Sequence, residues 1–345
     1  MSDVLTFAES WTAYTTGTVN GGASNGPIFL ARWTSTANGQ WSIIADSIGQ
    51  YAELTASGVS IFKTLRTHNA AYTVGFRVRI PTIAVTSLFT IYNNAQALGA
   101  VSINADGTVT LSGQSAGVSV IGTTNESIHA GKWYYFEVSI SLTGTTNINV
   151  AMILKINGSQ ILSGNINTGV NNTNLTSRDT TLNRIGFAGV AHLRDIYVNI
   201  GASQFDGDIT IRAIRPDGDL TSGWICSTGT TEYVLVNENF SDFDTTYVYQ
   251  TATGSQAIWS WQDLPTFSGT IKGIQISIMA RKDDEGSKSF EIVTGTTGTE
   301  TASPEFFVGD DYIAYFHCQD NDPATGVPYT VSGFNAKPFG IKVIS

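Results

Sequence analysis

The residues that come nearest to a catalytic motif are Gly-Gln-Ser-Ala-Gly at positions 113–117. In hydrolases, the pattern Gly-x-Ser-x-Gly places a nucleophilic serine on a sharp strand-to-helix turn, where a histidine and an acid support it. A strand-like segment precedes this copy, but residues 118–122 continue as a second strand and supply no helix. We therefore interpret Ser115 as a turn residue and predict that the chain is not an enzyme.

A polysaccharide hydrolase is the second catalytic alternative. It would need two carboxylates held roughly 5 to 10 Å apart across the sugar bond. The sequence has no Glu-x-Asp-x-x-Glu run, and acids of the predicted first domain stand singly, among them Glu53, Asp106, Glu126, Glu137, Asp179 and Asp195. This distribution is typical of turns and surface positions and disfavours a glycosidase.

The spacing of potential metal ligands gives little support for a metal site. No His-x-x-x-His or Cys-x-x-Cys pair occurs, and the four histidines are far apart: His68, His129, His192 and His317. The runs Asp217-Gly218-Asp219 and Asp283-Asp284-Glu285 could hold Ca²⁺ through carboxylate oxygens, but EF-hand spacing is absent. Aspartates in turns commonly bind their own backbone. We predict no cofactor, with Ca²⁺ as the alternative.

Four tryptophans are the candidate binding residues, as glycan contacts or as interface residues: Trp33, Trp41, Trp259 and Trp261. Trp259 and Trp261 lie two residues apart, so both indoles face the same side of an extended segment. Sugars stack on such platforms, but core residues show the same pattern because aromatic burial is large, and core or interface is the favoured interpretation. Trp33 and Trp41 could anchor the N-terminal region against its own sandwich or a neighbouring subunit. Trp133 and Trp224 are predicted to lie inside.

Composition narrows the classes of partner. The chain has 345 residues, of which 41% are hydrophobic and only 13% charged, with 18 basic against 28 acidic residues. The net charge of −10 argues against nucleic acid, which requires clustered Lys and Arg. The sequence has no run of about 18 apolar residues, so no membrane insertion is predicted. No signal peptide is visible. Cys226 and Cys318 are predicted to be buried free thiols, because nothing indicates an oxidising compartment.

The elements that must position these residues are almost all strands. Helical periodicity is nearly absent, whereas short alternating segments recur between Gly, Asn and Asp turns. In 72–80 the apolar residues occupy every second position, so Thr73, Arg77 and Arg79 are predicted to face away from the core. Asn157-Gly158 and 104–107 are predicted hairpin turns. Further strands are predicted at 51–56, 87–92, 100–104, 109–112, 133–142, 147–156, 181–188 and 193–200.

The length suits two domains. A turn-rich, weakly apolar segment at 1–25 is predicted to be an arm, either mobile or ordered only by a partner. A first β-sandwich is predicted over 26–203 and a second over 204–345. The strands predicted in the second domain are 209–214, 233–237, 246–249, 271–280, 289–293, 312–317 and 339–344. The fold class is therefore all-β, with two antiparallel β-sandwich domains.

Residues 50–200 resemble the laminin-G-like, concanavalin A-like superfamily. The residues that carry the resemblance are Gly131-Lys132-Trp133-Tyr134-Tyr135, Ile156-Asn157-Gly158 and Leu193-Arg194-Asp195-Ile196-Tyr197. The resemblance implies that the first domain is a concanavalin A-like jelly roll. It also implies binding more often than catalysis.

Residues 205–345 look like the C-terminal region of a family of tailed-bacteriophage virion proteins. The matching residues are Arg215-Pro216-Asp217-Gly218-Asp219, Trp224, Ser227-Thr228-Gly229, Asp244-Thr245-Thr246-Tyr247-Val248, Asp263-Leu264-Pro265 and Ala280-Arg281-Lys282-Asp283-Asp284. This resemblance implies a structural component of the particle, of the tail-fibre, minor-tail or head-decoration type. Its localisation would be the virion, assembled in the host bacterial cytoplasm.

The sequence thus predicts a non-enzymatic virion structural protein that acts in particle assembly and display. Its expected partners are copies of itself, with a trimer as the expected state, and other virion proteins of capsid or tail. The alternative is an adhesin that binds a host surface glycan through loops of the first domain. Many weak contacts could then act together, because each further contact on one particle is effectively intramolecular.

Overall fold

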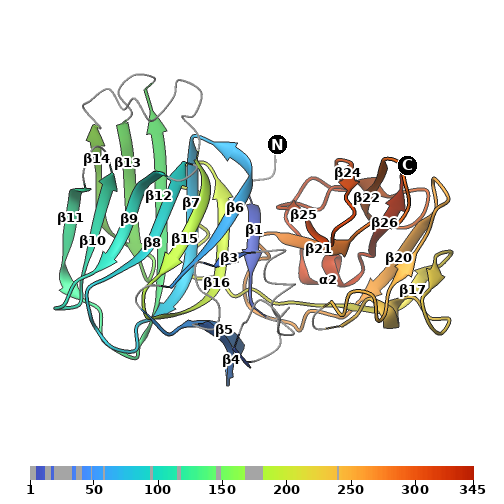
Figure 1. Cartoon of the computed structure of the whole chain (residues 1–345), viewed down its shortest axis with the longest axis horizontal. Coiled ribbons are helices and arrows are strands. Elements are labelled where there is room, and N and C mark those ends of the chain that lie inside the picture. The colour runs from blue at the N-terminus through green and yellow to red at the C-terminus, as the bar shows by residue number, and fades with distance from the viewer. Residues whose placement is uncertain are drawn as a thin grey trace. The chain divides into compact units, whose positions relative to one another are not determined.

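The computed structural model describes residues 5–11, 17–18, 33–35, 41–47, 49–56, 59–93, 96–114, 118–144, 149–167, 182–238 and 241–345. In these residues almost every regular element is a strand, and every pairing between named strands is antiparallel. An N-terminal unit ends at Ile211 and a C-terminal unit begins at Arg212 (Figure 1). The predicted all-β class is confirmed.

The N-terminal unit contains two sheets. Sheet A has the strand order β14-β13-β12-β7-β16-β5-β4-β2, with β1 also paired to β16, and sheet B has the order β11-β10-β9-β8-β15-β6-β3. The strands of sheet A are β1 (Leu5–Glu9), β2 (Gly17–Thr18), β4 (Trp41–Asp46), β5 (Gly49–Leu54), β7 (Ala71–Arg79), β12 (Trp133–Thr143), β13 (Asn149–Ile156), β14 (Ser159–Asn167) and β16 (Ala191–Ile200). Those of sheet B are β3 (Thr34–Ser35), β6 (Ser60–Asn69), β8 (Thr86–Asn93), β9 (Gln96–Ile103), β10 (Thr108–Gln114), β11 (Val118–Ser127) and β15 (Leu182–Ala188).

The core of this unit lies between the two sheets. Along β7, every second residue from Tyr72 to Val78 is an apolar side chain with no exposed surface. Phe76 of sheet A packs against Phe89 of β8 and Phe187 of β15, with ring centroids 5.5 and 5.0 Å apart. The inner faces of two antiparallel sheets therefore form one aromatic-rich core, which is the predicted sandwich.

Two hairpin turns are confirmed in position and in backbone geometry. Asn157 and Gly158 both have positive φ, 50° and 82°, between β13 and β14. A type I′ turn needs positive φ at both central residues, and Asn-Gly adopts it at low cost. Gly107, with φ 83°, closes the predicted turn between β9 and β10.

The predicted arm over 1–25 is described only in part. Leu5–Glu9 forms β1 and pairs with β16, and Gly17–Thr18 forms β2 and pairs with β4. The side chain of Trp11, just after β1, is completely buried. These described pieces are part of the sandwich, and the rest of the segment lies outside the described residues.

The C-terminal unit consists of one larger sheet and two strand pairs. Its six-stranded sheet, sheet C, has the order β17-β20-β26-β22-β23, with β24 also paired to β22. These strands are β17 (Pro216–Thr221), β20 (Gln256–Trp261), β22 (Lys288–Thr294), β23 (Thr301–Ala302), β24 (Phe306–Val308) and β26 (Phe339–Val343). The two pairs are β18 (Ile225–Cys226) with β19 (Val248–Tyr249), and β21 (Ile274–Ala280) with β25 (Ile313–Gln319).

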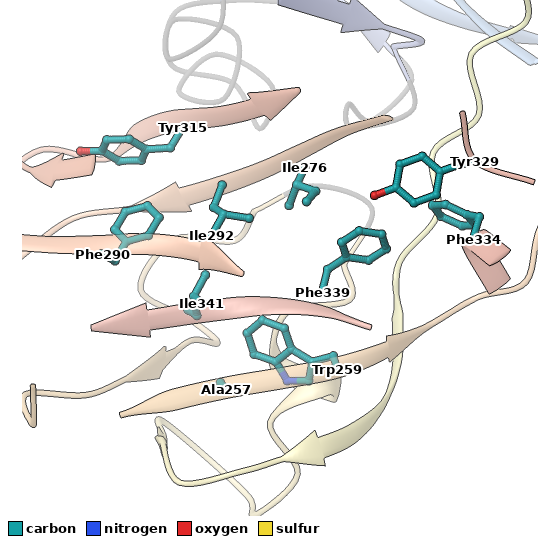
Figure 2. Close-up of a cluster of buried hydrophobic side chains, with 10 residues drawn as sticks. All are labelled: Ala257, Trp259, Ile276, Phe290, Ile292, Tyr315, Tyr329, Phe334, Phe339 and Ile341. Atoms are coloured by element: carbon teal, nitrogen blue, oxygen red, sulfur yellow. The ribbon is translucent and has the colours of Figure 1, made fainter. Parts of the chain in front are cut away.

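The core of the C-terminal unit is a single cluster of ten buried side chains (Figure 2). Sheet C contributes Trp259 from β20 and Phe290 from β22, among others. The second layer contributes Ile276 of β21 and Tyr315 of β25, and the Tyr315 ring packs edge-on against Phe290 at 5.2 Å. Phe334, from the short helix α2 (Val331–Asn335), closes one end of this core.

Two local predictions are wrong, and one short helix was not predicted. Residues 233–237, predicted as a strand, contain the 3₁₀ helix η1 (Tyr233–Leu235) instead. The Asp219 carboxylate accepts hydrogen bonds from the backbone N–H groups of Glu232 and Tyr233, and this distant side chain organises the turn. Helix α2 was not predicted, because its only start signal is Thr330, whose hydroxyl accepts from the Gly333 N–H. Residues 209–214, also predicted as a strand, form no strand. No helix in the described part of the chain is long and apolar enough to cross a membrane.

Candidate functional site

The structure places three of the four candidate tryptophans in cores. Trp33 and Trp41 are each 1% exposed and Trp259 is 5% exposed, so their faces are not open for stacking a sugar. Trp33 stacks on the buried Trp11 with centroids 5.3 Å apart. Trp261 is half-buried against the C-terminal core, and its Nε1–H donates to the Phe339 carbonyl at 3.2 Å. No glycan platform forms at these positions.

The other sequence candidates do not assemble into a site either. Among the described residues no group of three or more His, Cys, Asp or Glu could hold a metal ion. Asp219 binds backbone N–H groups, and Asp217 accepts from the Ser260 hydroxyl at 2.6 Å. Ser115 lies outside the described residues. Both cysteines are free, as predicted, but each is partly exposed instead of buried.

Polar, charged and aromatic side chains gather on the outer face of sheet A, the face turned away from the core. Because strand side chains alternate, Thr73, Gly75, Arg77 and Arg79 of β7 point to this face, as predicted for the three that carry side chains. Strand register brings further polar and aromatic residues beside them from β12, β16 and β5: Trp133, Tyr135, Glu137, Ser139, His192, Arg194, Tyr197, Asn199, Tyr51 and Glu53. Strands β12, β7 and β16 can be followed in Figure 1.

A β-bulge in β16 shapes this face. Arg194 is opposite Arg77 and Tyr197 is opposite Gly75, so successive outward positions are three residues apart instead of two. Asp195, in the bulge, has a φ of 50°, which is strained for a residue other than glycine. Its carboxylate accepts from the Ile211 N–H at 3.0 Å and lies 3.4 Å from Arg77 Nε. Burial raises the pKa of Asp195, against the opposing effects of the Ile211 hydrogen bond and Arg77.

One half of the outer face is covered by the chain itself. Residues 201–211, which we call the strap, follow β16 and run back across this face. The Thr73 hydroxyl donates to the Gly201 carbonyl and accepts from the Gln204 N–H, at 3.0 and 3.1 Å. The Ser203 N–H donates to Ser139 Oγ at 3.0 Å. Side chains of the sheet thus bind the backbone of the strap, which itself forms no strand.

The centre of the covered half is a buried carboxylate. Glu137 is 1% exposed, and its Oε1 accepts from the Tyr197 hydroxyl at 2.6 Å and from the strap's Gly207 N–H at 2.9 Å. The Tyr197 hydroxyl in turn accepts from the Asp206 N–H at 3.1 Å. Burial raises the pKa of Tyr197, so it remains a neutral donor. The missing side chain at Gly75 leaves the space that the Tyr197 ring occupies.

The other half of the outer face, which we call the open half, is an arginine–aromatic cluster. Its residues are Arg79, Arg194, Tyr51, Trp133 and His192, of which Arg79 and Trp133 are half-buried and the other three are buried. The guanidinium of Arg79 lies 5.2 Å from the Tyr51 ring centroid and 4.9 Å from that of Trp133. Arg194 lies 4.2 Å from Trp133, and Tyr51 stacks on His192 at 4.9 Å. Trp133, predicted to lie inside, is only half-buried because it begins β12 on the outer side.

The imidazole of His192 connects two charged residues of opposite sign. Arg79 reaches its Nδ1 through Nε at 3.0 Å and Nη2 at 2.7 Å, so Nδ1 is the acceptor. Its Nε2 lies 3.0 Å from Glu53 Oε1 and therefore carries the proton. Burial, and then the nearby Arg79 charge, lower the pKa of His192, while Glu53 opposes the shift. The ring is therefore neutral at pH 7, with both nitrogens occupied.

The three arginines of the face differ in how their charge is balanced. Arg77 pairs with Asp208 at 3.0 Å and Asp195 at 3.4 Å, and Arg194 pairs with Asp46 at 2.6 Å. Arg79 has no carboxylate at ion-pair distance among the residues that the structure describes. A guanidinium has five N–H donors, and His192 uses two, so three remain. The open half can therefore accept an anionic or strongly hydrogen-bonding ligand.

The comparisons with known proteins give no family. No protein-family model and no curated protein matches the chain. Among solved structures, it is similar to domain 4 of AbnA, a GH43 extracellular arabinanase from Geobacillus stearothermophilus, in complex with arabinotriose. That match has 18% identity and a TM-score of 0.38, over 59% of this chain and 95% of that one. It is also similar to the PL-14 alginate lyase from Aplysia kurodai, with 10% identity, a TM-score of 0.41, and 57% and 99% coverage.

A third similar structure is the carbohydrate-binding module CBM66 from Bacillus subtilis. Its identity is 10% and its TM-score 0.32, over 49% of this chain and 96% of that one. The TM-scores of these three matches are low.

The sequence contained one signal for the open half. The alternation at 72–80 predicted that Arg77 and Arg79 face outward, and the structure confirms this. The partners of Arg79 were missed because they come from strands 28 to 113 residues away in the sequence: Tyr51, Trp133 and His192. Their approach depends on the strand order β12-β7-β16-β5, which no local pattern encodes.

Proposed function

We propose that this chain is a non-enzymatic structural protein of a tailed-bacteriophage particle, in which the C-terminal unit mediates assembly. The observation that carries the proposal is the distribution of exposed apolar side chains. Of the twelve large hydrophobic residues that are exposed in the described chain, nine belong to the C-terminal unit, although the N-terminal unit is larger. Where such side chains adjoin one another, they mark protein–protein contacts. The resemblance of 205–345 to virion proteins supports the same role.

Three of these residues form a defined surface, which we call the β18–β19 patch. Ile225 and Tyr249 lie opposite each other across the pair, with 51% and 44% of their surface exposed. The ring of Tyr247 lies 5.9 Å from that of Tyr249. Apolar surface is unfavourable in water. Burying these side chains against a second copy would stabilise the complex by roughly 25 cal/mol for each Å² of apolar surface. We propose self-association through this patch, with a trimer as the assembled state.

Light scattering coupled to size-exclusion chromatography tests this assembly. The full chain should elute as an oligomer, with a trimer expected, and the double variant Ile225→Ser, Tyr249→Ser should elute as a monomer. Val85→Ser is the control, because Val85 is 73% exposed but belongs to the other unit. A wild-type monomer at micromolar concentration, or an oligomer that both variants leave unchanged, would contradict the assembly role.

Location on the particle is tested separately. A gold-labelled antibody raised against the chain should decorate phage particles whose genome carries this sequence, at a fixed position on head or tail. Particles without label, from a lysate in which the free protein is labelled, would contradict a virion role.

The second candidate function is attachment to a glycan, and a specific observation favours it. In the open half the guanidinium of Arg79, which has no carboxylate partner in the described part of the chain, lies near two aromatic rings and beside a neutral imidazole. Aromatic rings with a few fixed polar groups are typical of surfaces that bind small polar ligands. In an oligomer, three weak sites would act together, because each further contact is effectively intramolecular. The two functions can coexist on one particle.

A further inference from the structure

We propose that the open half binds a carboxylated glycan, with Arg79 as the residue that pairs with the sugar carboxylate. This inference rests on the glycan attachment proposed above and names the class of sugar. Ligand binding is thereby assigned to Arg79, whose guanidinium is held by His192 but has no carboxylate partner among the described residues.

The choice of an anionic group follows from charge balance. Arg77 and Arg194, on the same face, each have an acidic partner within the chain, and Arg79 has none among the described residues. Two of its donors are occupied by His192, which carries no charge, so its positive charge remains available. Arginine forks match planar carboxylates in a bidentate geometry, and charge-assisted bonds are about twice as strong as neutral ones. A carboxylate is therefore the group that completes this site.

The surroundings of Arg79 hold its guanidinium in place. One edge is fixed by two hydrogen bonds to His192 Nδ1, and the imidazole is fixed in turn by Glu53 at 3.0 Å. The rings of Tyr51 and Trp133 lie within 5.2 Å of the guanidinium carbon and restrict it further. The side chain has therefore already lost much of the freedom that binding would otherwise remove, which favours affinity.

The strand order favours a glycan over an acidic peptide. Extended peptides usually bind a sheet by adding to an open edge, where backbone groups are available. The open half lies on β12, β7, β16 and β5, and each of these strands has a neighbour on both sides. Only side chains are presented there, and a ligand must be recognised by its own hydroxyl and carboxylate groups. Sugars bind in this way.

A second arginine of similar chemistry provides a matched control. Arg184, on the outer face of sheet B, lies 4.7 Å from the Phe62 ring and 4.5 Å from the Tyr92 ring. It too has no acidic partner at ion-pair distance among the described residues, but no histidine fixes its guanidinium. If any arginine on an aromatic pair sufficed, both would bind equally. We assign the site to Arg79 because its guanidinium is held by hydrogen bonds.

The test is isothermal titration of the full-length chain with a galacturonate oligosaccharide. Its methyl-esterified form, with the same backbone and no charge, is the ligand control. At an ionic strength of about 0.15 M the Debye length is about 8 Å, so repulsion between the net charge of −10 and the anionic sugar is largely screened. Arg79→Gln should weaken binding of the acid about 10- to 100-fold, and methyl esterification should have a similar effect. Arg79→Lys, which keeps the charge but loses the fork, should be intermediate, and Arg184→Gln should bind as wild type.

Each other outcome overturns a different statement. Equal binding of acid and methyl ester, unchanged by Arg79→Gln, would overturn the carboxylate inference and leave glycan attachment standing. Loss of binding in Arg184→Gln alone would overturn the assignment to Arg79 and place the site on sheet B. Equally tight binding of polyglutamate would overturn the glycan class. No binding of either sugar would overturn both the inference and the attachment role, and assembly through the β18–β19 patch would be unaffected.

Discussion

The outer face of sheet A has two halves that are built on the same strands and differ in what covers them. In the covered half, polar side chains of β7, β12 and β16 bind the strap, and Glu137 and Thr73 are almost completely buried. In the open half, further along β7 and β12, lie Arg79 and Trp133, which are partly exposed. In the covered half, side chains of this face bind the backbone of the strap, whereas in the open half Arg79 has no carboxylate partner among the described residues.

The two halves should respond to substitution in opposite ways. Changes in the covered half should lower the free energy of unfolding, because its groups are desolvated and cannot find other partners. Changes in the open half should alter ligand binding or its pH dependence with a smaller effect on stability.

Gly75→Ala should give the largest effect. The new methyl would lie 1.9 Å from Tyr197 Cε1 and 2.6 Å from the Tyr135 hydroxyl, so the buried rings of the covered half would have to move. We expect a loss of about 3 kcal/mol in the free energy of unfolding of the N-terminal unit, as for overpacked cores. Urea denaturation, followed by circular dichroism, measures it.

Gly122→Ala is the matched control on sheet B. Its methyl would meet only the tip of Leu162, at 3.2 Å, and a small change is expected. Equal stabilities of the two variants would show that the covered half is not closely packed.

Glu137→Gln should have the next largest effect. The amide retains one acceptor but cannot accept as a charged group from both Tyr197 and the Gly207 N–H. We expect a loss of about 2 kcal/mol. Hydrogen exchange of the backbone amides at 203–211 should also become faster, because the strap loses its central anchor. Unchanged exchange in the strap would contradict the assigned role of Glu137.

The pH dependence of His192 should give the smallest effect on stability. Its pKa is lowered in the folded chain, so the folded state favours the neutral ring. The stabilisation is complete above the usual pKa of about 6.5 and is lost as the pH falls from there through the lowered pKa of the folded chain, at no more than about 1.4 kcal/mol per pH unit. The charged or titratable groups that face the ring are Arg79, Arg194, Glu53 and Tyr51.

Urea denaturation at pH 7.5 and pH 5 measures this dependence, with His192→Gln as the reference. Subtracting the free energy of unfolding of the variant from that of the wild type removes the contributions of other groups, including Asp195, whose pKa is raised. The difference in stability between wild type and variant should shrink at pH 5. A constant difference would show that the open half does not depend on a neutral imidazole.

Much of the fold could be predicted from local patterns. The alternation from Tyr72 to Val78 identified β7, its buried face and its outward arginines, because a strand in contact with a core on one side must alternate. Asn157-Gly158 identified a hairpin, because few other pairs tolerate two positive φ values. Strands β4 and β6 were not among the predicted strands.

The site could not be predicted because it depends on contacts between distant residues. Residues 209–214 alternate like a strand, yet near their start the backbone is bound by Arg77 and Asp195 side chains from 132 and 16 residues away. The bulge at Asp195, which turns Arg194 and Tyr197 to the same side, has no local sequence signature. Three of the four candidate tryptophans lie in cores, which agrees with the favoured interpretation that large aromatic side chains serve a core or an interface.

The open half is the proposed ligand site of this chain. The most direct measurement is a crystal structure of the full chain grown with the galacturonate oligosaccharide. The account predicts a sugar carboxylate within hydrogen-bond distance of Arg79, beside Trp133, with the strap still bound to Glu137. A sugar bound on sheet B or on the C-terminal unit, or one that displaces the strap and leaves Arg79 without contact, would contradict it.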